Sequence, residues 1–142
     1  MAFVKIFIHT VWTTKNREPI LQPDVLFPIL EHIRGYAKEN GIAIDRVNGH
    51  RDHLHVLLWL HPEKSIGKIV QLLKGESSHW INQQGYFKKR FSWNEGYFAG
   101  SISPSVITAV RRYVDDQQNH HTRVSFQEEY QMFLDMFKES GG

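Results

Sequence analysis

Two histidines lie two residues apart in an apolar stretch, His53-Leu54-His55, which is followed by Val56-Leu57-Leu58-Trp59-Leu60. Successive side chains of a strand point to opposite faces, so the even-numbered apolar residues form a core stripe. His53 and His55 then lie side by side on the other face, as two preorganised nitrogen ligands for a divalent metal ion. The triplet alone fits a solvated strand face equally well, so a third ligand is needed.

Tyr113 and Gln117 are four residues apart in a predicted helix, and therefore lie on one helical face. A phenol is a poor nucleophile at its ordinary pKa of about 10, and a neighbouring metal cation would favour the phenolate. The amide of Gln117 would be a third metal ligand, with the carboxylate of Asp116 as its rival. The spacing of Val110 and Tyr113 also fits a tyrosine that only packs in the core.

Basic and aromatic residues occur together in ways that suit a nucleic acid. The cations expected to contact DNA are Lys68, Lys74, Lys88, Lys89, Arg90, Arg111 and Arg112. The aromatic residues between and around the loop cations are Phe87, Phe91, Trp93 and Tyr97. Cations that bind phosphates, together with rings that stack on bases, are the usual means of holding a single strand. An ordinary solvated loop with core-seeking aromatics has the same composition.

Hydrophobic patterning predicts the elements that must position these residues. Strands are expected over 2–13, 42–48, 53–61 and 96–101. Helices are expected from Pro23 or Pro28 to Asn40, from Ser65 to the loop at Gly85, from Pro104 to about His120, and over about 125–138. The order β-α-β-β-α-β, followed by two helices, predicts an α+β fold of the ferredoxin-like (RRM-like) split βαβ type. Its four-stranded antiparallel sheet would carry two helices on one face and leave the other for a site.

The composition indicates how many domains to expect and which kinds of site and partner are excluded or permitted. The 142 residues suit a single domain over 1–142, with a core of about 2–121 and a C-terminal helix. The absence of cysteine excludes disulfides, thiolate zinc sites and cysteine nucleophiles. The net charge of +2 permits a polyanionic partner without requiring one. No apolar run of about 18 residues is present, so a cytoplasmic protein with no membrane partner is expected.

Several short motifs, taken in order, resemble one family. His53-Leu54-His55, preceded by Asp52, resembles the HUH motif, and 113–117 resembles the tyrosine helix of the same enzymes. The segments 10–15, 73–75, 93–97 and 119–121 are also similar. The chain thus resembles, from about Phe3 to Phe126, the insertion-sequence-200-like transposases, which are single-tyrosine HUH enzymes.

The resemblance implies a transposase that cuts and rejoins single-stranded DNA at the ends of a mobile element. Tyr113 would attack a phosphodiester and leave a 5′-phosphotyrosine and a 3′-hydroxyl, so that rejoining needs no ATP. His53, His55 and Gln117 would hold Mg²⁺ or Mn²⁺. The resemblance also implies DNA with hairpin ends as the substrate. It further implies a homodimer whose composite sites take the histidines from one subunit and the tyrosine from the other.

Two other functions remain open from the sequence. A silent single-stranded nucleic-acid-binding protein derived from a transposase would use the same basic and aromatic residues. A metal-dependent phosphoesterase that activates water would not need Tyr113. His9 is expected next to the histidine strand, where it packs in the core, supports the site or contacts DNA, and His120 and His121 either touch DNA or cap the helix.

Overall fold

The computed structural model describes residues 3–120, 128 and 131. Its elements are β1 (Phe7–Thr13), η1 (Lys15–Arg17), α1 (Pro23–Glu39), β2 (Ala43–His50), β3 (His53–Trp59), α2 (Ile66–Gln84), β4 (Phe98–Ile102), η2 (Pro104–Val106), α3 (Ile107–Asp115) and α4 (Gln117–His120). The expected β-α-β-β-α-β order is confirmed. His121 and all of the expected helix over 125–138 except residues 128 and 131 lie outside the described residues.

The four strands form one antiparallel sheet in the order β2-β3-β1-β4. β1 and β3 are therefore the central strands, and both are almost entirely buried. The register pairs Val11 of β1 and Asn48 of β2 with His55 of β3. Directly paired residues share a face of the sheet, so the histidine face of β3 continues onto both neighbouring strands.

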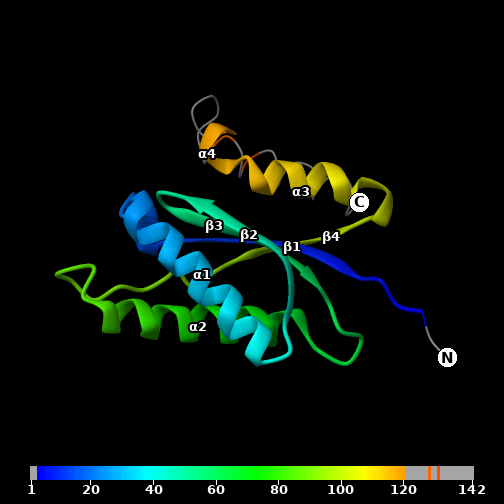
Figure 1. Ribbon diagram of the computed structural model, residues 1–142, viewed down its shortest axis with the longest axis horizontal. Helices are drawn as coiled ribbons and strands as arrows, with labels where there is room; N and C mark the ends of the chain where they lie inside the picture. The colour runs from blue at the N-terminus through cyan, green and yellow to red at the C-terminus, as the bar shows by residue number, and fades with distance from the viewer. Residues whose placement is uncertain (1–2, 121–127, 129–130, 132–142) are drawn as a thin grey trace.

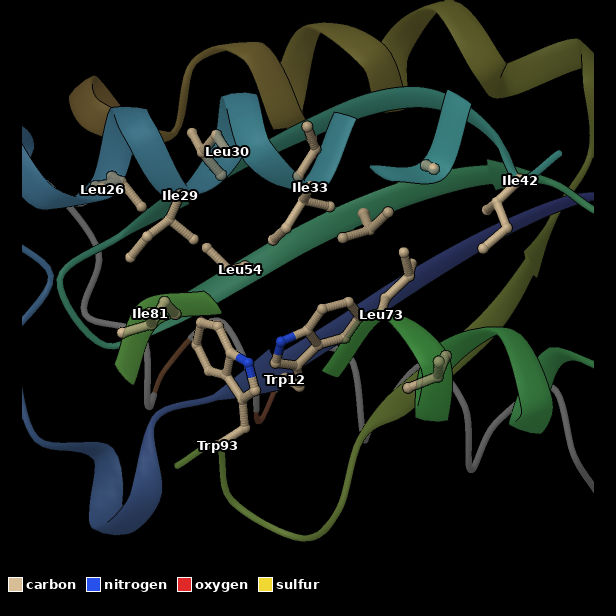
Figure 2. Packing of buried hydrophobic residues seen from close by; sticks show 14 of the residues in the cluster. Trp12, Leu26, Ile29, Leu30, Ile33, Ile42, Leu54, Leu73, Ile81 and Trp93 are labelled. Atoms are coloured by element: carbon tan, nitrogen blue, oxygen red, sulfur yellow. The ribbon is translucent and has the colours of Figure 1, made fainter. Parts of the chain in front are cut away.

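The main core lies between the sheet and the pair α1 and α2, which cover one face (Figure 1). Leu54, Val56 and Leu58 enter it from β3, as the alternation predicts. Helix residues that meet them include Ile29 and Ile33 of α1 and Leu73 and Ile81 of α2 (Figure 2). Among the described helices, none is both long and apolar enough to span a membrane.

The opposite face of the sheet is covered by α3, with α4 continuing along it (Figure 1). A second, much smaller apolar cluster joins Phe7 of β1, Leu57 of β3 and Ile107 of α3. Trp59, Ile102 and Val110 pack around its edge. The face expected to be left for a site is therefore roofed by the helix that carries Tyr113.

Several element boundaries differ from the sequence-based expectation, and the largest differences are in β1 and in the helix after Pro104. β1 begins at Phe7 rather than residue 2. The single helix expected from Pro104 to about His120 is divided into η2, α3 and α4, with a break at Asp116. The side-chain amide of Asn48 donates to the carbonyls of Val114, at 2.9 Å, and Asp115, at 3.2 Å. It thereby occupies acceptors that a continuous helix would use, which is a physical reason for the break.

β2 contains one extra residue relative to β3. Ile44 pairs with Leu58 and Arg46 pairs with Leu57, so Asp45 has no partner of its own in the ladder. This arrangement is a β-bulge, which lets two successive side chains leave the strand toward the same face. The sequence of 42–48 predicts a strand there but no bulge.

Candidate active and metal-binding site

The site begins on β3, where His53 and His55 both point to the α3 face of the sheet. Both side chains are fully buried, at 0% exposure. Their rings lie 5.1 Å apart at an angle of 80°. The strand pleat supplies the spacing, and the roof formed by α3 and α4 excludes water from the pair.

Each histidine is held through its Nδ1 atom. Nδ1 of His53 lies 2.8 Å from Oδ1 of Asp52, and Nδ1 of His55 lies 2.8 Å from Nε2 of His9. Such contacts fix the ring orientation and the tautomer of a metal-binding histidine. With Nδ1 engaged in each ring, Nε2 is the nitrogen of each imidazole that could hold a metal ion. His9 thus lies next to the histidine strand, where it is buried and contacts His55 directly.

Tyr113 and Gln117 approach the histidines from α3 and α4. Oε1 of Gln117 lies 3.3 Å from Nε2 of His53. The amide nitrogen of Gln117 donates to the carbonyl of Tyr113 at 3.2 Å, which turns the oxygen toward the histidine. The ring of Tyr113 lies 5.6 Å from that of His55, nearly perpendicular to it. One chain therefore brings all four predicted residues together.

Asp116 does not join this group. It is exposed, and its Oδ1 accepts from the side chain of Asn119 at 2.8 Å. Among the described residues, no cluster of three or more histidines and carboxylates is placed to hold a metal ion. The amide of Gln117, rather than the carboxylate of Asp116, supplies an oxygen close to Nε2 of His53.

The donor set fits a divalent ion. Two ligands that each lie about 2.1 Å from a common ion are themselves about 3 to 3.5 Å apart, and the His53–Gln117 separation of 3.3 Å falls in that range. Two imidazoles and a neutral amide oxygen suit a borderline transition metal better than a hard ion, because imidazole is a softer ligand than carboxylate or water.

Comparison with known proteins identifies the family. The family model described as "Transposase IS200 like" matches residues 2–117, which include all four residues of the site. The chain belongs to the IS200-like transposase family. The ISDra2 transposase TnpA of Deinococcus radiodurans is 25% identical to it over 116 residues, which cover 78% of this chain and 83% of TnpA.

Solved structures share the IS200-like fold. A crystal structure of a protein from Deinococcus radiodurans R1, assigned as a transposase, matches with a TM-score of 0.68 and 25% identity, over 82% of this chain and 93% of that one. A REP-associated tyrosine transposase bound to a REP hairpin matches with a TM-score of 0.63 and 14% identity, over 87% and 73% of the two chains. The predicted α+β class with a four-stranded antiparallel sheet is confirmed.

Three of the predicted DNA-contacting residues of this IS200-like chain lie together. Lys88, Lys89 and Arg90 are exposed and line a surface pocket of about 480 Å³ between η1 and the loop that follows α2. Tyr86 and Phe87 contribute aromatic surface to the same pocket. Lys68 is also exposed, but on α2 and outside this pocket.

The other predicted DNA-contacting cations lie in different surroundings in the structure. Arg112 lines a shallow pocket of about 280 Å³ together with Tyr113 and Asp116. Arg111, one residue earlier, instead binds Asp45. The ammonium of Lys74 donates to the carbonyls of 94, 95 and 96 at 2.6 to 3.0 Å. Burial lowers the pKa of Lys74, as expected for an ammonium that anchors a loop.

Sequence reasoning missed the residues of β2 that hold the tyrosine helix, Asp45 and Asn48. Asn48 bonds reciprocally with Gln118, whose amide nitrogen also donates to the carbonyl of Gly49 at 2.9 Å. No local pattern marks these residues, because their partners lie about 70 residues further along the chain. The one available signal was the polar run 45–46 inside a strand that otherwise reads as half buried.

Proposed function

We propose that this chain is a single-tyrosine transposase that cleaves and rejoins single-stranded DNA at the ends of an insertion sequence. Tyr113 is the nucleophile, and His53, His55 and Gln117 hold a divalent metal ion. The observation that carries the proposal is the convergence of these four side chains from β3, α3 and α4, with Gln117 at 3.3 Å from His53 and the Tyr113 ring at 5.6 Å from that of His55.

Exposure supports this division of roles. The histidines and Gln117 are buried, whereas Tyr113 is half-buried and opens on the shallow pocket that Arg112 also lines. A phosphodiester can therefore reach the phenol from solvent while the metal ligands stay dry. Arg112 supplies a positive charge beside the nucleophile, which favours the approach of a phosphate.

The reaction is a transesterification. The phenol of Tyr113 gives up its proton and its oxygen bonds to the phosphorus, the bond from phosphorus to the 3′-oxygen breaks, and the leaving oxygen takes up a proton to become a 3′-hydroxyl. The phosphodiester energy is retained in the 5′-phosphotyrosine. A 3′-hydroxyl can then attack that linkage and restore the tyrosine, so rejoining consumes no ATP.

IS200-like transposases of the HUH type generally use a divalent metal. When bound, such an ion would favour the phenolate and stabilise charge on the phosphoryl oxygens. In this chain it would be Mg²⁺ or Mn²⁺. The nitrogen-rich donor set favours tighter binding of Mn²⁺ than of Mg²⁺.

The DNA is proposed to be single-stranded with hairpin ends. A REP hairpin is bound in the structure of one relative of the same fold. In this chain Lys88, Lys89 and Arg90 supply cations and Tyr86 and Phe87 supply rings for stacking. This chemistry suits the unpaired bases and phosphates next to a hairpin.

The protein is proposed to act as a homodimer. Within the described chain, Tyr113 lies over the histidines of the same chain, so exchange of the tyrosine helix is not required for the four residues to meet. Mixing the Tyr113→Phe and His53→Ala variants distinguishes the arrangements. Restored cleavage would show composite sites, and continued inactivity would show sites completed within one chain.

The decisive experiment uses labelled single-stranded DNA from the flanks of the gene, with Mn²⁺, on a denaturing gel. Wild type is compared with Tyr113→Phe, and with Tyr36→Phe as a matched loss of a phenol on α1. We expect a metal-dependent DNA–protein band that disappears only in Tyr113→Phe. Cleavage that survives in Tyr113→Phe would indicate a nuclease that uses water. Binding without any cleavage would indicate a silent binding protein.

A further inference from the structure

The bulge in β2 directs two successive side chains at the tyrosine helix. In a regular strand Asp45 and Arg46 would point to opposite faces. Here the carboxylate of Asp45 binds Arg111, and Nε of Arg46 lies 3.3 Å from Oδ2 of Asp115. Arg111 and Asp115 are four residues apart, on one flank of α3. The extra residue in β2 thus creates a double attachment to that flank.

Asp45 is the stronger half of this attachment. Nε of Arg111 donates to Oδ1 of Asp45 at 2.8 Å, and Nη2 donates to Oδ2 at 2.7 Å. The indole nitrogen of Trp59 donates to the same carboxylate at 2.8 Å. The Asp45 side chain is only 7% exposed, so its two oxygens are held from both β3 and α3. A bidentate pair fixes direction as well as distance.

The apolar contact below α3 is small, since it centres on Phe7, Leu57 and Ile107. Such a contact attracts the helix to the sheet without fixing its rotation about its own axis. Arg111 and Tyr113 are two residues apart, about 200° around the helix, so they lie on opposite flanks of its buried face. A roll of about 10° would move the phenol oxygen by about 1.5 Å, given a helix radius of about 2.3 Å and the length of the side chain.

We propose that the Asp45–Arg111 pair is a positioning device that fixes the roll of α3 and thereby the place of the Tyr113 hydroxyl relative to His53 and His55. The proposal rests on the proposed function, because it assigns Tyr113 as the nucleophile. It removes Arg111 from the DNA-contacting residues. It leaves Arg112, on the neighbouring side of the helix, as the cation that faces the substrate.

The test measures covalent adduct formation in a single turnover, over a range of DNA concentrations, for Arg111→Gln, Asp45→Asn and the double variant. Misplacing a reacting atom by about 1 Å can cost about 100-fold in rate, so we expect each single variant to lose about 10- to 100-fold at saturating DNA. The DNA concentration for half-saturation should be unchanged. The double variant should lose no more than either single one, because both break one pair.

Two comparisons give the test its specificity. Arg111→Lys keeps the positive charge but loses the bidentate geometry of the guanidinium, and should retain a rate between those of wild type and Arg111→Gln. Arg112→Gln should raise the half-saturating DNA concentration instead. If Arg111→Gln raises only that concentration and leaves the saturated rate at the wild-type value, Arg111 is a DNA contact and the proposal is wrong.

Hydrogen exchange separates this proposal from the proposed function. In Arg111→Gln the amides of α3 should exchange faster than in wild type, while those of α1 and α2 should not change, because the main core lies on the other face of the sheet. This measurement needs no active enzyme. If wild type forms no adduct with DNA, the proposed function fails, whereas the exchange pattern still decides whether the pair holds the helix. Unchanged exchange in α3 would overturn the positioning role.

Discussion

Nε2 of His9 and Nδ1 of His55 lie 2.8 Å apart on neighbouring central strands, and both side chains are buried. Their rings are nearly parallel, at 18°. One of the two nitrogens must carry the proton of this hydrogen bond, so the tautomer of His9 and the tautomer of His55 are linked. The contact links β1 directly to the proposed metal ligands.

Replacing His9 should therefore weaken metal binding without removing a ligand. Loss of a residue that supports a ligand typically costs about 10- to 100-fold in metal affinity, and we expect this for His9→Leu. His9→Gln keeps a polar group at the position and should lose less. Calorimetric titration with Mn²⁺ measures both, with His32→Gln on α1 as the control. Wild-type affinity in His9→Leu would show that the contact does not orient His55.

The basic loop makes a prediction about salt. Replacing Lys88, Lys89 and Arg90 with Gln should reduce the slope of log binding constant against log salt concentration by about 2, at about 0.7 per phosphate contact on a single strand. Fluorescence anisotropy with single-stranded DNA at several salt concentrations measures the slope. Lys38→Gln, an exposed cation on α1, should leave it unchanged. An unaltered slope in the triple variant would place the DNA elsewhere.

The Asp45–Arg111 pair predicts a dependence of stability on pH. The guanidinium of Arg111 beside Asp45 holds the pKa of that carboxyl below its ordinary value of 3.8. A carboxyl with a lowered pKa stabilises the fold at pH values above its unfolded pKa, and that contribution is lost as the pH falls through the folded pKa. Wild type should therefore exceed Asp45→Asn in free energy of unfolding at pH 7, and the difference should shrink below about pH 4. Urea titrations at each pH provide the comparison, and a constant difference would contradict it.

Gly49, in β2 just before the turn to β3, should tolerate no side chain. A Cβ there would collide with the carbonyl oxygen of His53 and a methyl group of Leu54. Gly49→Ala should therefore destabilise the protein by about 1 to 3 kcal/mol, as overpacking does. Gly35 of α1 has nothing within 4 Å of its Cβ position, and Gly35→Ala should stabilise by about 0.5 to 1 kcal/mol. Chemical denaturation measures both, and equal effects would refute the steric argument.

The sequence allowed the fold and the histidine pair to be predicted, because both depend on local patterns. The alternation around His53 and His55 is a property of eight consecutive residues. The four-residue spacing of Tyr113 and Gln117 is likewise local. The structure brings these two local features together within one chain, whereas the resemblance implied that the tyrosine comes from the other subunit.

The supporting contacts could not be predicted, because they join residues far apart in the chain. The His9–His55 contact depends on the register of β1 against β3, which a single sequence does not specify. The bulge at Asp45 interrupts the alternation of faces along β2, so a strand prediction alone does not give the directions of Asp45 and Arg46. For the same reason Arg111 was grouped with Arg112 as a DNA contact, although Arg111 binds Asp45 and Arg112 lines the pocket beside Tyr113.

The two faces of the sheet have separate roles. The large core under α1 and α2 maintains the fold, and the thin layer under α3 holds the residues of the proposed active site. Substitutions in the second layer should therefore abolish the proposed strand cleavage while the first layer preserves a folded protein with its basic loop intact. On the proposed function, a change of one or two codons would leave a protein that still binds DNA without moving the element, so this architecture would make the route to domestication short.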